Sequence, residues 1–112
     1  MLADMIMFLR KAQGFTGGGY AEFSQSELIQ FAVTWAYQTV GEIAKRFPDS
    51  FRTAHPEINW RQLIGFRDFL AHNYERIDVG PLWAAVEDLP VLIPALQALH
   101  DSLPDSPQPD TE

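Results

Sequence analysis

Apolar residues recur at every third or fourth position through most of this chain, which is the period of a helix with one buried face. Residues 2–13 show this pattern first, and residues 25–47 show it over the longest stretch. We find no segment with the strict alternation of apolar and polar residues that is typical of a half-buried strand. The pattern therefore predicts an all-α fold, an up-down bundle of four to five helices.

The ends of the two helices that matter most are predicted from their capping residues. Ser24 and Glu27 match a capping box, so Ser24 is expected to be the N-cap of the long helix over residues 25–47. Asn59 is the expected N-cap of a second helix, from residue 60 to about residue 74.

Shorter elements are predicted between and after these helices. The three glycines at 17–19 indicate a flexible connection, and residues 51–54 indicate a short turn of helix. Because proline suits the first turn of a helix, two further helices are expected to begin near Pro81 and Pro90.

Composition limits the class of protein. A chain of 112 residues is one domain by length, which we place at residues 1–103, followed by an acidic, proline-rich tail at 104–112 that is expected to be disordered. The chain has no cysteine, which excludes disulfides and thiolate metal sites. No apolar run approaches the roughly 20 residues that a membrane span needs, and the N-terminus does not resemble a signal peptide. We therefore expect a cytoplasmic protein without a membrane partner.

The charge of the chain is unevenly distributed. The net charge is −7 overall, and such a charge argues against general affinity for nucleic acid. Six of the eight basic residues, however, lie within residues 45–76, and residues 77–112 have seven acidic residues and no basic one. The middle of the chain is thus its only positive third. By charge alone, these side chains serve equally well to solvate helix faces.

Inside that positive third, the otherwise apolar helical segment 65–74 contains Arg67, Asp68, His72 and Tyr74. On a helix, Asp68 and His72 lie one turn apart on one face, and Arg67 shares a face with Tyr74. Arg67 and His72 point about 140° apart. One helix alone therefore aims them at different places, although they can converge in a cleft beside it or across two copies of it.

Four residues separate Arg67 from His72, and one residue separates His72 from Tyr74. This spacing resembles the R-x4-H-x-Y motif of the HepT-like toxins, which are small helical ribonucleases of the HEPN superfamily. The flanking segments at 40–46, 56–61 and 78–83 are also similar to those of this family. The resemblance covers roughly residues 1–103. It implies a helical bundle and the toxin of a toxin–antitoxin pair, a metal-independent endoribonuclease that cuts tRNA or mRNA.

The same resemblance implies a partner and a modification. In this family a minimal nucleotidyltransferase, the MNT antitoxin, can attach AMP to the motif tyrosine and block the site. Tyr74 matches that position. The expected partners are thus RNA, an MNT antitoxin and a second copy of the chain, with no DNA, no cofactor and no metal.

RNA cleavage without a metal needs a base for the 2′-hydroxyl, an acid for the leaving oxygen and a cation for the phosphorane. A histidine such as His72 can serve as acid or base, and Arg67 has the planar fork that matches phosphate. Asp68, where many relatives have Asn, could fix the tautomer of His72, or its charge could weaken RNA binding. A symmetric homodimer, through the motif helix and the wide apolar surface of residues 28–47, would supply both acid and base.

A structural alternative remains at this point. Arg67 could pair with Asp68, Glu75 or another acid as a clamp between helices, and His72 could cap carbonyl groups at the end of its helix. The chain would then be a catalytically inactive binding module that acts as partner or substrate of a nucleotidyltransferase.

Overall fold

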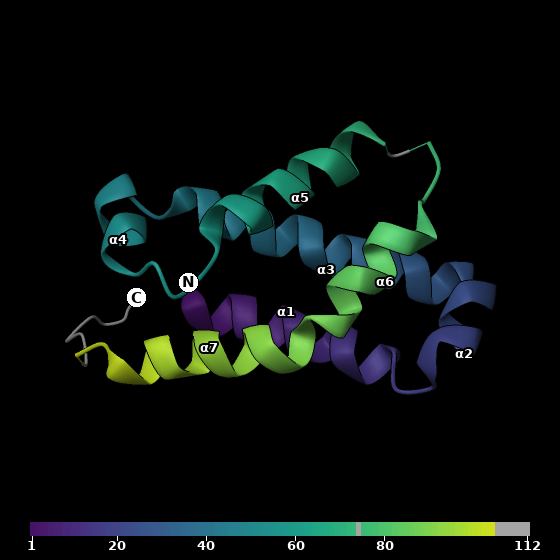
Figure 1. Cartoon of the computed structure of the whole chain (residues 1–112), viewed down its shortest axis with the longest axis horizontal. Helices are drawn as coiled ribbons and strands as arrows, with labels where there is room; N and C mark the ends of the chain where they lie inside the picture. Colours follow the sequence, from purple (N-terminus) through teal and green to yellow (C-terminus); the bar gives the residue numbers. More distant parts are fainter. Residues whose placement is uncertain (74, 105–112) are drawn as a thin grey trace.

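The computed structural model describes residues 1–73 and 75–104, so Tyr74 and the predicted tail from residue 105 onward lie outside it. The described residues form helices and no strand, which confirms the all-α prediction (Figure 1). The helices are α1 (Leu2–Phe15), α2 (Gly19–Gln25), α3 (Glu27–Arg46), α4 (Asp49–Ala54), α5 (Trp60–His72), α6 (Val79–Glu87) and α7 (Leu89–Ser102).

Four longer helices, α1, α3, α5 and α7, run alternately up and down along the long axis of the molecule (Figure 1). The central helix is α3, which packs against α1 on one side and α5 on the other, while α7 packs against α1. The largest fully buried side chains come from α1, α2, α3, α6 and α7: Met5, Leu9, Phe23, Val33, Val40, Leu82, Leu89 and Leu96.

The described residues form seven helices, two more than the five predicted at most. The extra helices are short and form where the sequence indicated a flexible connection and a single turn. Gly19 adopts a positive φ of 87°, which glycine tolerates at no steric cost, and the chain re-enters a helix at once. The result is α2, and Ser24 lies inside it with its hydroxyl donating to the carbonyl oxygen of Ala21.

The predicted N-cap at Ser24 is therefore wrong, and Ser26 caps α3 instead. The backbone at Ser26 is extended, with φ −115° and ψ 103°, and its hydroxyl oxygen accepts a hydrogen bond from the Ile29 N–H at 3.1 Å. The two serines are alternatives in sequence, and the packing of α2, whose Phe23 is fully buried, selects the second.

The helix that holds the motif begins as predicted. The side chain of Asn59 accepts a hydrogen bond from the Gln62 N–H at 3.1 Å, which confirms it as the N-cap of α5. The helix ends at His72, slightly before the predicted end. The last two helices begin close to the predicted prolines. α6 begins at Val79, two residues before Pro81, with Asp78 as its N-cap, and α7 begins one residue before Pro90.

No single helix of the described part is long and apolar enough to span a membrane, although α6 and α7 pass that test together, with a 51° bend between them.

Candidate active site

The site is built on the crossing of α3 and α5, and a glycine allows the two helices to come close. A Cβ added to Gly41 would lie 2.2 Å from the Cβ of Arg67 and 3.0 Å from the main-chain oxygen of Leu63. Real side chains do not approach so closely, so α5 can pack this close to α3 only because residue 41 is a glycine. Gly41 thus determines where the base of the Arg67 side chain lies.

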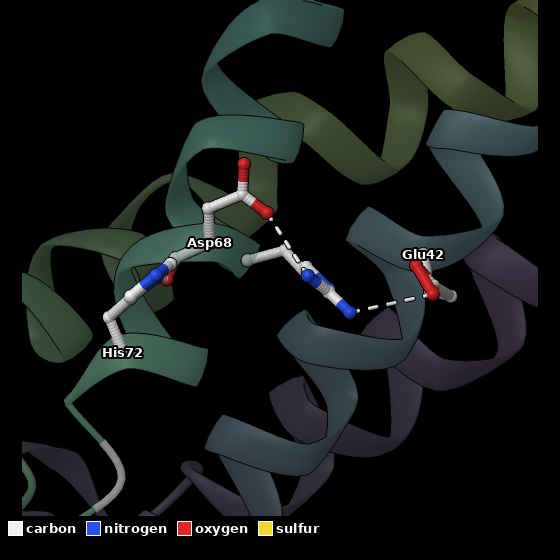
Figure 2. A network of polar contacts seen from close by, with 4 residues as sticks. Glu42, Asp68 and His72 are labelled. Atoms are coloured by element: carbon white, nitrogen blue, oxygen red, sulfur yellow. Dashed lines mark hydrogen bonds and ion pairs between the residues drawn. The ribbon is translucent and has the colours of Figure 1, made fainter.

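The guanidinium group of Arg67 lies between two carboxylates, one from each helix (Figure 2). Its Nη1 donates to Asp68 Oδ1 at 3.1 Å, and its Nη2 is 3.5 Å from Glu42 Oε2. The Arg67 side chain is 29% exposed, so these pairs are partly shielded from solvent. A guanidinium has five N–H donors, which leaves several of them for a third anionic group.

His72 lies at the exposed end of α5, and the main chain holds its imidazole. The Nδ1 atom of His72 is 2.7 Å from the carbonyl oxygen of Asp68, one turn earlier (Figure 2). Because a carbonyl oxygen can only accept a hydrogen bond, Nδ1 must be the nitrogen that carries hydrogen. In the neutral ring Nε2 then has a free lone pair and can accept a proton.

The structure corrects the role predicted for Asp68. This residue does fix the tautomer of His72, but its main-chain oxygen makes the contact and its carboxylate pairs with Arg67. Both contacts expected if Arg67 and His72 were structural residues are present: Arg67 pairs with Asp68, and His72 contacts a carbonyl oxygen at the end of the helix. Neither contact occupies Nε2 of His72.

The two motif residues stay apart within one chain, as their spacing predicted. Arg67 pairs with Glu42 of α3. The imidazole of His72 lies on the other side of Asp68 from Glu42 (Figure 2). No hydrogen bond joins Arg67 to His72 among the residues that the structure describes.

A hollow of about 470 Å³ opens beside Arg67 and brings in residues that the sequence did not single out. Its lining includes Glu42, Arg46 and Trp35 from α3. In the sequence, Glu42 belongs to a segment similar to the family, but nothing there predicts that it contacts Arg67. The two residues meet because α3 and α5 cross.

An apolar surface lies next to this hollow, along the exposed face of α3. Leu28, Phe31 and Trp35 recur at helical spacing with 80%, 59% and 65% of their surface exposed, and Phe69 of α5 is also exposed. Tyr37, by contrast, is buried, and its hydroxyl donates to the carbonyl oxygen of Ala85 at 2.6 Å. Burial, with Asp88 nearby, raises the pKa of Tyr37 above its ordinary value.

Potential metal ligands are not gathered near this site. Within residues 1–73 and 75–104, no three His, Asp or Glu side chains lie close enough together to hold a metal ion.

Comparison with known families identifies the chain. The model of the family "Ribonuclease HepT-like" matches residues 5–99, which is most of the sequence. The chain belongs to the HepT-like family. The matched region includes all of α3 and α5 and the motif residues.

Individual relatives of this HepT-like chain agree with that assignment. It is 42% identical over 74 residues to the probable ribonuclease HepT of Thermococcus cleftensis, covering 65% of this chain and 67% of that protein. A Methanocaldococcus jannaschii protein whose name proposes an RNase is 36% identical over 72 residues, covering 63% of this chain and 66% of the relative. The chain thus spans about two thirds of these relatives. No solved structure gives a significant match.

Proposed function

We propose that this HepT-like chain is a metal-independent endoribonuclease and the toxin of a toxin–antitoxin pair. One observation carries the proposal. Near the end of one helix, a histidine with Nδ1 bound to the main chain and Nε2 open follows a partly shielded arginine by five residues. Family membership supports RNA as the substrate, with tRNA or mRNA as the proposed target.

The proposed reaction uses these two side chains in separate roles. Nε2 of His72 takes the proton of a ribose 2′-hydroxyl, whose oxygen then attacks the adjacent phosphorus. Arg67 stabilises the negative charge of the phosphorane. The bond from phosphorus to the 5′-oxygen breaks, and a protonated imidazole supplies the proton to that oxygen. The products are a 2′,3′-cyclic phosphate and a 5′-hydroxyl, and DNA is not a substrate because it lacks the 2′-hydroxyl.

The proposal is tested by purifying the protein without any partner and incubating it with total RNA in the presence of EDTA. Cleavage with 2′,3′-cyclic phosphate ends supports it, and products with 3′-hydroxyl ends or a requirement for a divalent ion would contradict it. The competing proposal is an inactive binding module, which the pairing of Arg67 with two carboxylates favours. Intact RNA after incubation with folded protein would support that alternative.

The reaction needs a base and an acid, and one chain places only one motif histidine near Arg67. We propose a homodimer through the apolar surface formed by Leu28, Phe31, Trp35 and Phe69, which lies beside the hollow at Arg67. Burial of this surface would bring two copies of the site together.

For this dimer, light scattering at micromolar concentration should give twice the mass of the chain. Trp35→Glu should give the single mass, because it puts a charge into the proposed interface. Val91→Glu is the matched control, since Val91 is 76% exposed on α7, away from that surface. A monomeric parent protein, or dissociation caused equally by both variants, would contradict the proposed dimer.

Tyr74 is the proposed regulatory position, as the site where a partner nucleotidyltransferase attaches AMP. Because Tyr74 lies two positions after His72, an added phosphate would lie close to the motif and could pair with Arg67. In the cytoplasm, where we place the pair, such a group would occupy the cation that RNA needs.

Co-expression with an active cognate nucleotidyltransferase should add one or more AMP masses to a peptide that contains Tyr74. Tyr74→Phe should abolish the addition and leave the circular dichroism spectrum unchanged. If the mass persists in Tyr74→Phe, another residue is the site of modification.

A further inference from the structure

One exposed face of α5 continues from the motif toward α4. Arg61, Gly65, Asp68 and His72 are separated by four, three and four residues, so they form one line along the helix. This line is opposite to the buried side chains Leu63 and Leu70. From His72 to Arg61 it extends roughly 16 Å, at 1.5 Å per residue.

A large open hollow lies beside this line, between α4 and α5. Its volume is about 900 Å³, and it reaches from Asp68 past Gly65 and Arg61 to Arg52 and Thr53 of α4. At the motif end the hollow is lined by Asp68, whose carboxylate pairs with Arg67. A chain-like ligand that passes Asp68 therefore has open space along α5 toward α4.

Arg61 is the cation on this path that is available to a ligand. Arg52 already pairs with Asp49, whereas no acidic side chain of the described residues forms an ion pair with Arg61. Three carboxylates also line the hollow, Asp49, Glu57 and Asp68, and the first and last of them pair with arginines. Arg61 is exposed. In a chain of net charge −7, an arginine without an acidic partner on the same helix face as the motif is suited to hold a phosphate.

Gly65 stands in the middle of the same line, and the fold gives no reason for a glycine there. A Cβ added at Gly65 would meet no atom within 4 Å, so the position does not serve close helix packing. Glycine inside a helix also destabilises it compared with alanine. The bare backbone is instead consistent with the close approach of a ligand.

We propose that the face of α5 from His72 to Arg61 is an RNA-binding subsite. In this arrangement Arg61 binds a phosphate of the same strand that is not the one cleaved, and Gly65 leaves room for the ribose-phosphate backbone between them. The inference rests on the proposed function, since it assumes that RNA is the ligand of the motif. The negative charge of Asp68 on this face is offset by its pair with Arg67.

The test measures RNA affinity separately from cleavage. In a His72→Ala background, the binding of a fluorescent single-stranded RNA of twelve nucleotides is followed by anisotropy at several salt concentrations. Arg61→Gln should weaken binding roughly tenfold, the loss expected for one charge-assisted contact. It should also reduce the slope of log K against log salt by about 0.7, as expected for one lost phosphate contact on a single strand. Arg10→Gln is the matched control, because it removes the same group from α1 at a different surface hollow, and should leave both quantities unchanged.

A second variant tests the bare backbone. Gly65→Leu should fold normally, because the added side chain enters open space, and should weaken RNA binding by blocking the path. The subsite is overturned if Arg61→Gln binds as the parent does, if Arg10→Gln weakens binding equally, or if Gly65→Leu binds RNA unchanged. If the parent protein itself fails to bind RNA, the proposed function fails together with the subsite.

Discussion

Replacement of His72 by alanine should reduce RNA cleavage by 10²-fold or more, the loss typical of a general acid–base group. The effect should be this large because the imidazole is both the proposed base and, from a second copy, the proposed acid. His72 is exposed, and within residues 1–73 and 75–104 its one hydrogen bond is to the main chain of its own helix. The variant should therefore keep its stability within about 0.5 kcal/mol of the parent.

His100→Ala is the matched control for this experiment. His100 is also an exposed histidine near the end of a helix, and its Nδ1 lies 3.1 Å from Asp101 on α7. That hydrogen bond helps to lower the pKa of Asp101, but it lies away from the α3–α5 crossing. Cleavage rates are measured under single-turnover conditions with each variant. If His72→Ala and the parent cleave RNA at the same rate, the catalytic assignment is wrong.

The local parts of the site were predictable because they depend on residues near one another in the chain. Asn59 caps α5 as expected, since a cap and its target lie within one turn. The divergence of Arg67 and His72 also follows from the helical period alone. The helical period did not predict which acceptor of Asp68 each neighbour would contact. Asp68 has a carboxylate and a main-chain carbonyl, and Arg67 contacts the first while His72 contacts the second.

The tertiary parts of the site could not be predicted in this way. Glu42 and Arg67 are 25 residues apart, and their contact exists only because α3 and α5 cross at Gly41. The boundary between α2 and α3 depends in the same way on the burial of Phe23. Both features are decided by packing between helices, which periodicity does not describe.

Replacement of Gly41 by alanine should destabilise the protein by about 1–3 kcal/mol, the usual cost of overpacking a well-packed contact. The new Cβ would overlap the Cβ of Arg67 and press on the Leu63 carbonyl, both of which are fixed to the α5 backbone. Because no side-chain rotation can relieve this overlap, α5 must shift and carry Arg67 with it. RNA cleavage should therefore fall together with stability.

Gly65→Ala gives the opposite expectation in the neighbouring helix. Its Cβ would enter open space, so the change should stabilise the protein by up to about 1 kcal/mol through the higher helix propensity of alanine. Urea unfolding of the two variants and the parent measures both effects on one scale. A stabilising Gly41→Ala, or equal losses at the two glycines, would show that close contact between α3 and α5 does not hold Arg67 in place. A loss of stability at Gly41 alone, with cleavage reduced by more than the unfolded fraction accounts for, would mean that the close crossing of α3 and α5 sets the position of Arg67, the proposed phosphate-binding arginine.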